Sequence, residues 1–353
     1  MKLEDLGYND QLEQYRIHHH LEGFDTGRII AEHKERYIAW TQKGEYEAEI
    51  TGHLRFMANS REDFPAVGDW VALKSFEGGP AIIHHVYPRF STVRRGTVGG
   101  NSSVQVIATN IDYAFLVQAV DRDFNLNRLE RYLTLCYDSG VKPLIVLTKT
   151  DLVEEEQLEE LVSRIQARIK DVPVLTISNL TRSGYDTLIS FIRRGKTYCL
   201  LGSSGVGKST LLNVLRGSAH MKTGAISDST SKGRHVTSHR ELVVLENGGL
   251  LVDNPGMREV GIADAGSGLE TTFDTITRLA KSCRYRDCTH TREAGCAVRE
   301  AVEEGTLDRA AYENYLKMER EKTHFEATAA ERRQKDRQFG KMMKNYKKGQ
   351  KKH

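Results

Sequence analysis

The stretch that decides the fold is GSSGVGKST, residues 202–210, which fits the pattern G-x-x-x-x-G-K-[ST] of a phosphate-binding P-loop. In such a loop, the backbone N–H groups of a glycine-rich turn at a helix N-terminus wrap phosphates, a lysine adds positive charge, and a hydroxyl reaches Mg²⁺. The glycines of the motif suit the turn, Lys208 suits the β- and γ-phosphates, and Ser209 suits the metal. The sequence therefore predicts a nucleoside-phosphate site at this loop.

The residues on either side of the loop agree with this interpretation. Residues 197–201 (TYCLL) form a short apolar run that predicts a buried strand, and residues 210–215 have the apolar spacing of a helix. A glycine turn before an ordinary helix is the alternative, but it does not require this strand and helix. The motif lies more than halfway along the chain. A candidate segment for base recognition, residues 148–151, comes before it.

Length and composition set broad limits on the class of protein. With 353 residues the chain is long enough for two or three domains. No apolar run reaches the roughly 18 residues of a membrane span, and the N-terminus lacks the apolar stretch of a signal peptide. We therefore expect a cytoplasmic protein. Five cysteines, three of them between residues 283 and 296, favour thiol or metal chemistry over a disulfide framework.

The charge is unevenly distributed along the chain. Residues 332–353 contain ten Lys or Arg and one acid, so this tail carries +9, while the other residues carry −6. A basic tail of this kind suits RNA or another polyanion. A solvated helix end or a disordered tail is the alternative.

The region from about residue 27 to residue 107 has the pattern of a small β-barrel. Short β-like stretches such as RYIAW and DWVALKS alternate with glycine-rich turns. An OB-fold is the leading candidate for this barrel, and OB-folds commonly bind RNA or oligosaccharide. A barrel with a purely structural role stays open, because a fold alone does not give a function.

From residue 111 the pattern changes to alternating strands and helices. The expected strands are IDYAFLVQAV, PLIVLT and VPVLTIS, and the expected helices lie near residues 127–137, 154–169 and 183–193. This order predicts an α/β domain with a mainly parallel sheet. Later, Asn247-Gly248 between two apolar runs predicts a hairpin that brings Asp253 to the end of the sheet. Residues 271–315 are expected to be mostly helical.

The segment Thr148-Lys149-Thr150-Asp151 follows a predicted strand, so it lies at a carboxyl end, where ligands bind in open α/β sheets. A carboxylate there accepts two hydrogen bonds from the guanine N1–H and N2–H₂ edge, which adenine lacks. Asp151 would therefore select guanine, and Lys149 can lie along the base. Taken alone, Asp151 is more simply a helix N-cap. The P-loop favours base recognition.

Residues 253–256, DNPG, fit a D-x-x-G loop. Asp253 would belong to the Mg²⁺ shell, and the Gly256 N–H would meet the γ-phosphate, so the loop could sense hydrolysis. A plain Asn-Pro-Gly turn is the alternative. The polar segment GRHVTSHRE precedes this loop and is a candidate switch, in which Thr237, or else Ser238, would add a second hydroxyl to Mg²⁺.

Cys283, Cys288, His290 and Cys296 have the spacing C-x4-C-x-H-x5-C. Three thiolates and one imidazole make a closed tetrahedral zinc set, so the site is expected to be structural, because a catalytic zinc needs an open position. Cysteines buried without a ligand are the alternative. Several arginines nearby make the knuckle basic, which suits an RNA surface.

Taken in order, TKTD, ISN, the P-loop, GRHVTS and DNPG resemble the motifs of the circularly permuted GTPases. With the barrel before them and the cysteine cluster after them, the chain resembles the small-ribosomal-subunit biogenesis GTPases (the RsgA family) over roughly residues 27–320. This resemblance implies an α/β, circularly permuted P-loop GTPase domain with an N-terminal OB-fold β-barrel and a C-terminal, mainly helical zinc-binding domain. The expected parts are an N-terminal extension (1–26), an OB-fold RNA-binding domain (27–107), the GTPase domain (108–264), the zinc-binding domain (265–320) and a basic tail (321–353).

The resemblance also implies roles for individual residues. The nucleotide would be bound by Thr148, Lys149, Asp151, Ser178, Asn179, Gly202, Ser203, Ser204, Gly205, Val206, Gly207, Lys208, Ser209, Thr210 and Gly256. Magnesium would be held by Ser209, Thr237 and Asp253. The catalytic set would be Lys208, Thr237, Asp253 and His235. Two positions depart from the usual pattern, because Thr148 stands where the base-reading motif has Asn and Asn179 stands where the companion loop often has Ala.

Met257 follows Gly256 at the position where many related GTPases carry a glutamine that orients the attacking water. An apolar side chain cannot orient water. We therefore expect slow intrinsic hydrolysis and a partner that completes the site, which for this family is the small ribosomal subunit. His235 is the candidate for positioning the water, and a surface histidine without a role is the alternative.

The expected function is a GTPase that binds the small ribosomal subunit and its rRNA. It would hydrolyse GTP to GDP and phosphate when stimulated by the subunit, late in the subunit's maturation. The expected cofactors are one structural Zn²⁺ and Mg²⁺ with GTP or GDP, and we expect a monomer without membrane contact. One alternative, favoured by Met257, is an RNA-binding assembly factor with incidental turnover. Another, favoured by Thr148, is an ATPase.

Overall fold

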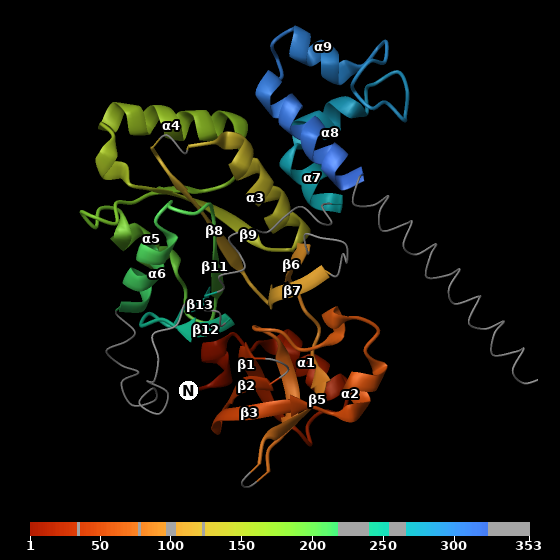
Figure 1. Cartoon of the computed structure of the whole chain (residues 1–353), viewed down its shortest axis with the longest axis vertical. Coiled ribbons are helices and arrows are strands. Elements are labelled where there is room, and N and C mark those ends of the chain that lie inside the picture. The colour runs from red at the N-terminus through yellow and green to blue at the C-terminus, as the bar shows by residue number, and fades with distance from the viewer. Residues whose placement is uncertain are drawn as a thin grey trace, which may run out of the picture.

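A computed structural model gives the fold of the chain. It describes residues 1–33, 36–76, 79–96, 104–121, 124–217, 240–253 and 266–323. A β-barrel, an α/β domain and a helical C-terminal domain follow one another along the chain (Figure 1). The predicted fold class is thus confirmed. In the described ranges, no helix is both long enough and apolar enough to cross a membrane.

Five strands close the N-terminal barrel: β1 (Asp25–His33), β2 (Arg36–Thr41), β3 (Gly44–Ile50), β4 (Trp70–Lys74) and β5 (Ala81–Val86). Their order is β1-β2-β3-β5-β4, and β4 pairs again with β1. The β3–β5 pair is parallel and the other pairs are antiparallel. Ile29, Val71 and Ile83 are fully buried inside. This closed five-stranded topology agrees with the predicted OB-fold.

Short helices accompany the barrel. Helix α2 (Gly52–Met57) lies between β3 and β4 in the chain, and its Thr51 hydroxyl accepts a hydrogen bond from Leu54 N as an N-cap. Before the barrel, a 3-10 turn buries Leu3 and Leu6, and helix α1 (Asp10–His18) follows. The N-terminal residues therefore pack on the core.

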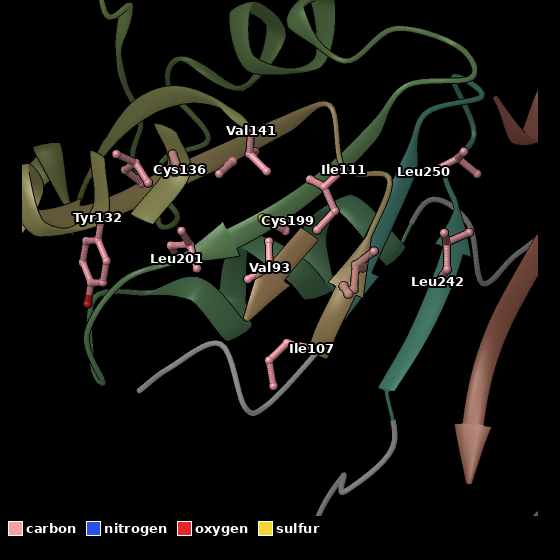
Figure 2. Packing of buried hydrophobic residues seen from close by; sticks show 14 of the residues in the cluster. Val93, Ile107, Ile111, Tyr132, Cys136, Val141, Cys199, Leu201, Leu242 and Leu250 are labelled. Carbon is pink, nitrogen blue, oxygen red and sulfur yellow. The ribbon is translucent and has the colours of Figure 1, made fainter. Parts of the chain in front are cut away.

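A hairpin of β6 (Thr92–Gly96) and β7 (Val104–Thr109) connects the barrel to the α/β domain and forms a separate two-stranded sheet. Figure 2 shows Val93 and Ile107 of this hairpin near Cys199 and Leu201 of the α/β sheet, and all four belong to one buried cluster. The same cluster contains barrel residues such as Trp70. Because one apolar core crosses this junction, the two domains bury surface against each other.

The α/β sheet has the order β10-β9-β8-β11-β13-β12. Its strands are β8 (Tyr113–Ala119), β9 (Lys142–Thr148), β10 (Val174–Thr176), β11 (Thr197–Leu201), β12 (Arg240–Val244) and β13 (Leu250–Asp253). All neighbouring strands are parallel except β12 and β13, which form the predicted hairpin. Gly248 has a φ of +81° in its turn, a conformation that favours glycine.

Helices cover both faces of this sheet (Figure 1). They are α3 (Leu126–Asp138), α4 (Glu155–Arg168), α5 (Tyr185–Phe191) and α6 (Lys208–Gly217). Successive residues of β8 alternate between the two faces: Leu116 packs in the cluster of α3 and α4, and Phe115 in the cluster of α5 and α6. Burial on both faces explains why the strands read as continuous apolar runs.

Strand β12 joins the α/β sheet to the barrel. It pairs with β13 on one side and with β1 on the other, where Ala31 lies opposite Glu241 and Glu32 lies opposite Arg240. The two domains therefore share one eleven-stranded sheet. Strand β12, which begins within the candidate switch segment, is thus also the strand that contacts the barrel.

The C-terminal domain consists of α7 (Gly266–Thr272), α8 (Asp274–Ala280), α9 (Ala297–Glu303) and a helix over residues 309–323. Its own core includes Phe273, Ile276 and Val298. The domain contacts α3 through α7 (Figure 1). A charged network adds to this contact, because the buried Glu130 of α3 accepts hydrogen bonds from Arg168 Nε (2.6 Å) and Asn314 Nδ2 (2.6 Å).

Arg28 is buried where the N-terminal turn, the barrel and the α/β sheet meet. Its guanidinium donates to the carbonyl oxygens of Leu6, Gly68 (3.2 Å) and Asn110 (3.0 Å), and to Thr197 Oγ1 (2.9 Å). Burial lowers the pKa of this guanidinium to about 10, and Asp112 partly offsets the effect. Arg28 therefore remains charged at neutral pH. It connects four segments of the chain by donating hydrogen bonds to three carbonyl oxygens and one hydroxyl.

We expect Arg28→Met to destabilise the chain strongly, because it leaves buried carbonyl oxygens without their donor. Each such acceptor costs about 1–3 kcal/mol, so the free energy of unfolding should fall by about 3 kcal/mol or more. Urea denaturation followed by circular dichroism measures the loss. Lys43→Gln, which removes an exposed ion pair with Asp25, is the control and should have a much smaller effect. Equal stability of the two variants would contradict the role of Arg28.

Candidate functional site

The P-loop connects β11 to α6 and has the backbone that its glycines predict. The φ angles are +154° at Gly202, +82° at Gly205 and +93° at Gly207. A Cβ atom at Gly202 would lie 2.3 Å from the Val117 carbonyl oxygen, and one at Gly207 would lie 2.5 Å from Asn179 Nδ2. Both the conformation and the available space therefore require glycine.

Lys208 is the first residue of α6, and its side chain bends back over the loop. Its Nζ donates to the carbonyl oxygens of Gly202 (2.6 Å) and Ser203. Ser209 and Thr210 follow in the first helical turn, where the backbone N–H groups and the helix dipole favour an anion. The loop thus presents one cation and one helix N-terminus on the same side, as a phosphate site requires.

Two other loops are hydrogen-bonded to the P-loop. Thr148, fully buried at the end of β9, donates through Oγ1 to the Val206 carbonyl oxygen (2.6 Å). Asn179 donates through Nδ2 to the Gly207 carbonyl oxygen (3.2 Å) and accepts a bond from Tyr185 OH (2.7 Å). The two positions that depart from the usual motifs therefore fasten the predicted base-binding loops to the phosphate loop.

The side chains that are predicted to contact the base lie close to Thr148 and Asn179 in the sequence. Lys149 has a φ of +61°, and its Nζ pairs with Asp121 Oδ2 (2.8 Å). Ser178, which is buried, donates through Oγ to Oδ1 of the exposed Asp151. Because this bond holds one carboxylate oxygen of Asp151, it fixes the direction in which the other oxygen can accept N–H donors.

Asp253 ends β13 at the same edge of the sheet as the P-loop, because β13 is parallel to β11. Its Oδ2 lies 3.2 Å from Nη1 of Arg216 near the C-terminal end of α6. A carboxylate and a serine hydroxyl at one site are hard oxygen donors, which fit Mg²⁺. The predicted residues Thr237, His235 and Gly256, together with Met257, the other DNPG residues after Asp253 and residues 324–353 of the basic tail, lie outside the described residues.

Sequence reasoning missed two charged residues of this site. Asp121 follows β8 and pairs with Lys149, and Arg216 pairs with Asp253. The signal for Asp121 was its place just after a predicted strand. The signal for Arg216 was a single basic residue seven positions after Ser209, which puts both residues on one face of the helix.

The four predicted zinc ligands come together in the C-terminal domain. Their ligand atoms all lie within 4.8 Å of one another. His290 Nδ1 is 3.6 Å from Cys283 Sγ and 3.5 Å from Cys296 Sγ, and these two sulfurs are 3.9 Å apart. Tetrahedral zinc, with bonds of about 2.3 Å to sulfur and 2.0 Å to nitrogen, places its ligands about 3.5–3.8 Å apart. The cluster therefore fits one zinc ion.

The electrostatics and second shell of the cluster agree with this fit. Burial, together with the neighbouring thiols, raises the pKa of Cys288 to about 12, a cost that a bound cation removes. Burial also lowers the pKa of His290, which favours the neutral imidazole that binds metals. Tyr312 OH donates to the His290 carbonyl oxygen (2.7 Å), so the helix over residues 309–323 supports the ligand.

The fold and the site define a P-loop GTPase whose motifs are circularly permuted. A family model described as RsgA GTPase matches residues 86–263, and this chain belongs to that family. A model described as ABC transporter also matches residues 189–353, a stretch that contains the P-loop. The chain hydrolyses GTP as an enzyme of its family, and the match covers both the base-side loops and the phosphate loop.

Individual relatives and solved structures support the assignment. The chain is 41% identical over 321 residues to "Small ribosomal subunit biogenesis GTPase RsgA 2" of Listeria monocytogenes, covering 91% of this chain and 89% of the relative. It is 40% identical over 336 residues to the RsgA of Opitutus terrae, covering 92% and 90%. The crystal structure of YjeQ from Thermotoga maritima matches with a TM-score of 0.62 and 25% identity, covering 85% of this chain and 98% of that one.

We expect Cys296→Ala to lose the metal and unfold the C-terminal helices, because structural zinc contributes about 10–16 kcal/mol to the folding of small zinc domains. Elemental analysis of the wild-type chain should give one zinc per chain, and limited proteolysis should cut the variant, but not the wild type, within residues 266–323. Cys136→Ala, which removes a buried thiol outside the cluster, should retain the metal. Full zinc content in Cys296→Ala would exclude the four-ligand site.

Proposed function

We propose that this chain binds the small ribosomal subunit and its rRNA and hydrolyses GTP to GDP and phosphate, stimulated by the subunit, late in the subunit's maturation. The observation that carries the proposal is the pair of hydrogen bonds from Thr148 and Asn179 to backbone carbonyl oxygens of the P-loop. These bonds join a base site to a phosphate site in the permuted order. The relatives that this chain matches over most of its length are named for small-subunit biogenesis.

On the base side, we assign guanine recognition to Asp151, with Lys149 along the ring and Ser178 holding the carboxylate. Guanine offers two adjacent donors, N1–H and N2–H₂, whereas adenine offers an acceptor at N1. A carboxylate accepts from both donors of guanine and repels the adenine acceptor. Thr148 and Asn179 act in this proposal as the connection to the P-loop, which leaves base selection to Asp151.

On the phosphate side, we assign charge stabilisation to Lys208 and to the backbone N–H groups of residues 203–210. Phosphoryl transfer to water needs positioning and electrostatic stabilisation, with no covalent intermediate on the protein. Ser209, Asp253 and Thr237 would hold Mg²⁺, which supplies positive charge to the β- and γ-phosphates when bound. His235 keeps its proposed role in positioning water, and Gly256 its proposed contact with the γ-phosphate.

RNA binding is proposed for the barrel, the zinc knuckle and the basic tail. Around the knuckle, Arg284, Arg286 and Arg292 are exposed. Tyr285 has 46% of its surface exposed, and the Arg284 guanidinium lies 5.5 Å from the centre of its ring. Exposed cations beside an aromatic ring suit phosphates and unpaired bases, so this surface supports an RNA partner over an apolar one.

We further propose a monomer located in the cytoplasm. One chain supplies the base side, the phosphate side and the zinc ligands of the described site, so a second copy adds no residue that the chemistry requires. A factor that acts on maturing small subunits works where those subunits are assembled. An RNA-binding assembly factor with incidental turnover remains the second candidate, because Met257 cannot orient the attacking water.

The deciding experiment measures GTP turnover with purified small subunits, large subunits or neither. We expect small subunits alone to raise turnover at least about tenfold, which corresponds to about 1.4 kcal/mol of transition-state stabilisation. Lys208→Ala should abolish the stimulated rate. Lys196→Gln, which removes an ion pair with Asp112 at the opposite end of β11, should keep it. No response to small subunits would favour the assembly factor.

Asp151→Asn tests the base assignment separately. An amide presents one donor and one acceptor, which no longer match two guanine donors but do match the N1–H and O2 of xanthine. Since a hydrogen bond to a charged group contributes about 1.5–3 kcal/mol, GTP affinity should fall about 10- to 100-fold and XTP should bind more tightly than GTP. Competition of GTP, XTP and ATP against a fluorescent guanine nucleotide measures this. Unchanged GTP preference would remove Asp151 from the base site.

A further inference from the structure

Arg216, near the C-terminal end of α6, contacts both strands of the β12–β13 hairpin. Its Nη1 is 3.2 Å from Asp253 Oδ2, and its Nη2 is 3.5 Å from Glu241 Oε2. Arg216 lies in the last turn of α6, while Glu241 and Asp253 stand directly opposite each other on β12 and β13. One side chain of α6 thus contacts both strands of the hairpin.

We propose that Arg216 positions Asp253 for magnesium binding by holding one oxygen of its carboxylate. This inference rests on the proposed function, which makes Asp253 part of the Mg²⁺ shell. Oxygen ligands of metals are commonly oriented by outer hydrogen-bonding partners, and loss of such a partner typically costs 10- to 100-fold in metal affinity or activity. Arg216 is a positioning residue in this scheme, because it acts through Asp253.

The helix geometry directs Arg216 toward the metal side of the site. Ser209 and Arg216 are seven residues apart, so they share one face of α6 and are separated by about 10.5 Å along its axis. Helical side chains point back toward the N-terminus of their helix. Arg216 therefore reaches toward Ser209 and meets Asp253 on the way. Because Arg216 holds Oδ2, Oδ1 is the oxygen of Asp253 that this proposal assigns to the metal.

Burial makes the contact with Asp253 the stronger of the two. The side chains of Arg216 and Asp253 are 19% and 22% exposed, whereas Glu241 is 57% exposed. Water therefore screens the contact with Glu241 more than the contact with Asp253. In the described part of the chain, the buried Nε and Nη2 of Arg216 have no hydrogen-bond partner. The contact with Asp253 is then the main restraint on this guanidinium.

Charge gives a second reason for an arginine at this position. Like charges that stand directly opposite each other on neighbouring strands destabilise the pair. Glu241 and Asp253 are such a pair, and Arg216 lies within ion-pair distance of both. The planar, forked guanidinium can contact two carboxylates at once, which a lysine ammonium on its flexible stem does less well. Lysine should therefore restore only part of the function.

The test is a Mg²⁺ titration of fluorescent GDP binding to the full chain. For Arg216→Gln, we expect the Mg²⁺ concentration at half-maximal binding to rise about 10- to 100-fold. The affinity measured in EDTA should stay the same, because the P-loop is intact. Arg216→Lys should lie between this variant and the wild type. Lys196→Gln serves as the matched control, since it removes an ion pair at the amino end of β11 and should titrate like the wild type.

Three results would overturn the role of Arg216. An equal Mg²⁺ requirement in Arg216→Gln would mean that the guanidinium does not position Asp253 for the metal. A lower requirement would mean that the guanidinium competes with Mg²⁺ for Asp253. An equal loss of affinity in EDTA would mean that the variant disturbs the P-loop itself. Asp253→Asn separates this inference from the proposed function: if this variant titrates like the wild type, the assignment of Asp253 to the metal fails, and the role of Arg216 fails with it.

Discussion

The rest of this structure depends on the parallel pairing of β11 with β8 on one side and β13 on the other. Parallel strands present their carboxyl ends at one edge of the sheet, so whatever follows them in the chain meets there. The P-loop follows β11, Asp253 ends β13, and Thr148 ends β9 next to β8. Residues separated by more than a hundred positions therefore form one site, and permutation of the chain leaves that site intact.

Permutation does change which connections leave the site. Because the base-side strands come first, the chain passes the P-loop late and reaches Asp253 shortly before the C-terminal domain begins. Strand β12, free to be an edge strand, pairs instead with β1 of the barrel. An unpaired edge is a liability that proteins usually cover. Here the barrel covers the edge, and the pairing of β12 with β1 fixes the barrel directly against the nucleotide-binding sheet.

Much of the fold could be predicted from the sequence because local patterns determined it. The run TYCLL is β11, and Asn247-Gly248 forms the turn of a hairpin, because both signals are contained within a few residues. The zinc ligands were predictable for the same reason: thiols and imidazole at short spacings have few other uses. The confirmed class of the protein followed from the order of such motifs.

What escaped prediction depends on contacts between distant segments. Arg28 reads as an ordinary strand residue, yet it is buried because four segments meet around it. Thr148 looked like a departure that weakens the base motif, whereas its hydroxyl bonds to the P-loop across 58 positions of sequence. Arg216 likewise takes its meaning from Asp253. Pairings of this kind follow from the register of strands and helices, which no local pattern specifies.

The C-terminal domain shows how tightly this arrangement is connected. Only residues 254–265 separate Asp253 from α7, and α7 packs directly on α3. A Cβ at Gly268 of α7 would lie 2.2 Å from the Thr134 carbonyl oxygen, so the backbones of α7 and α3 are in contact. Helix α3 also carries Glu130, which Arg168 and Asn314 hold from two sides. The chain that leaves Asp253 therefore enters, after twelve residues, a helix that is packed against α3. The zinc-binding domain is thus joined to α3 at two places, because α7 packs on α3 and Asn314 donates a hydrogen bond to Glu130.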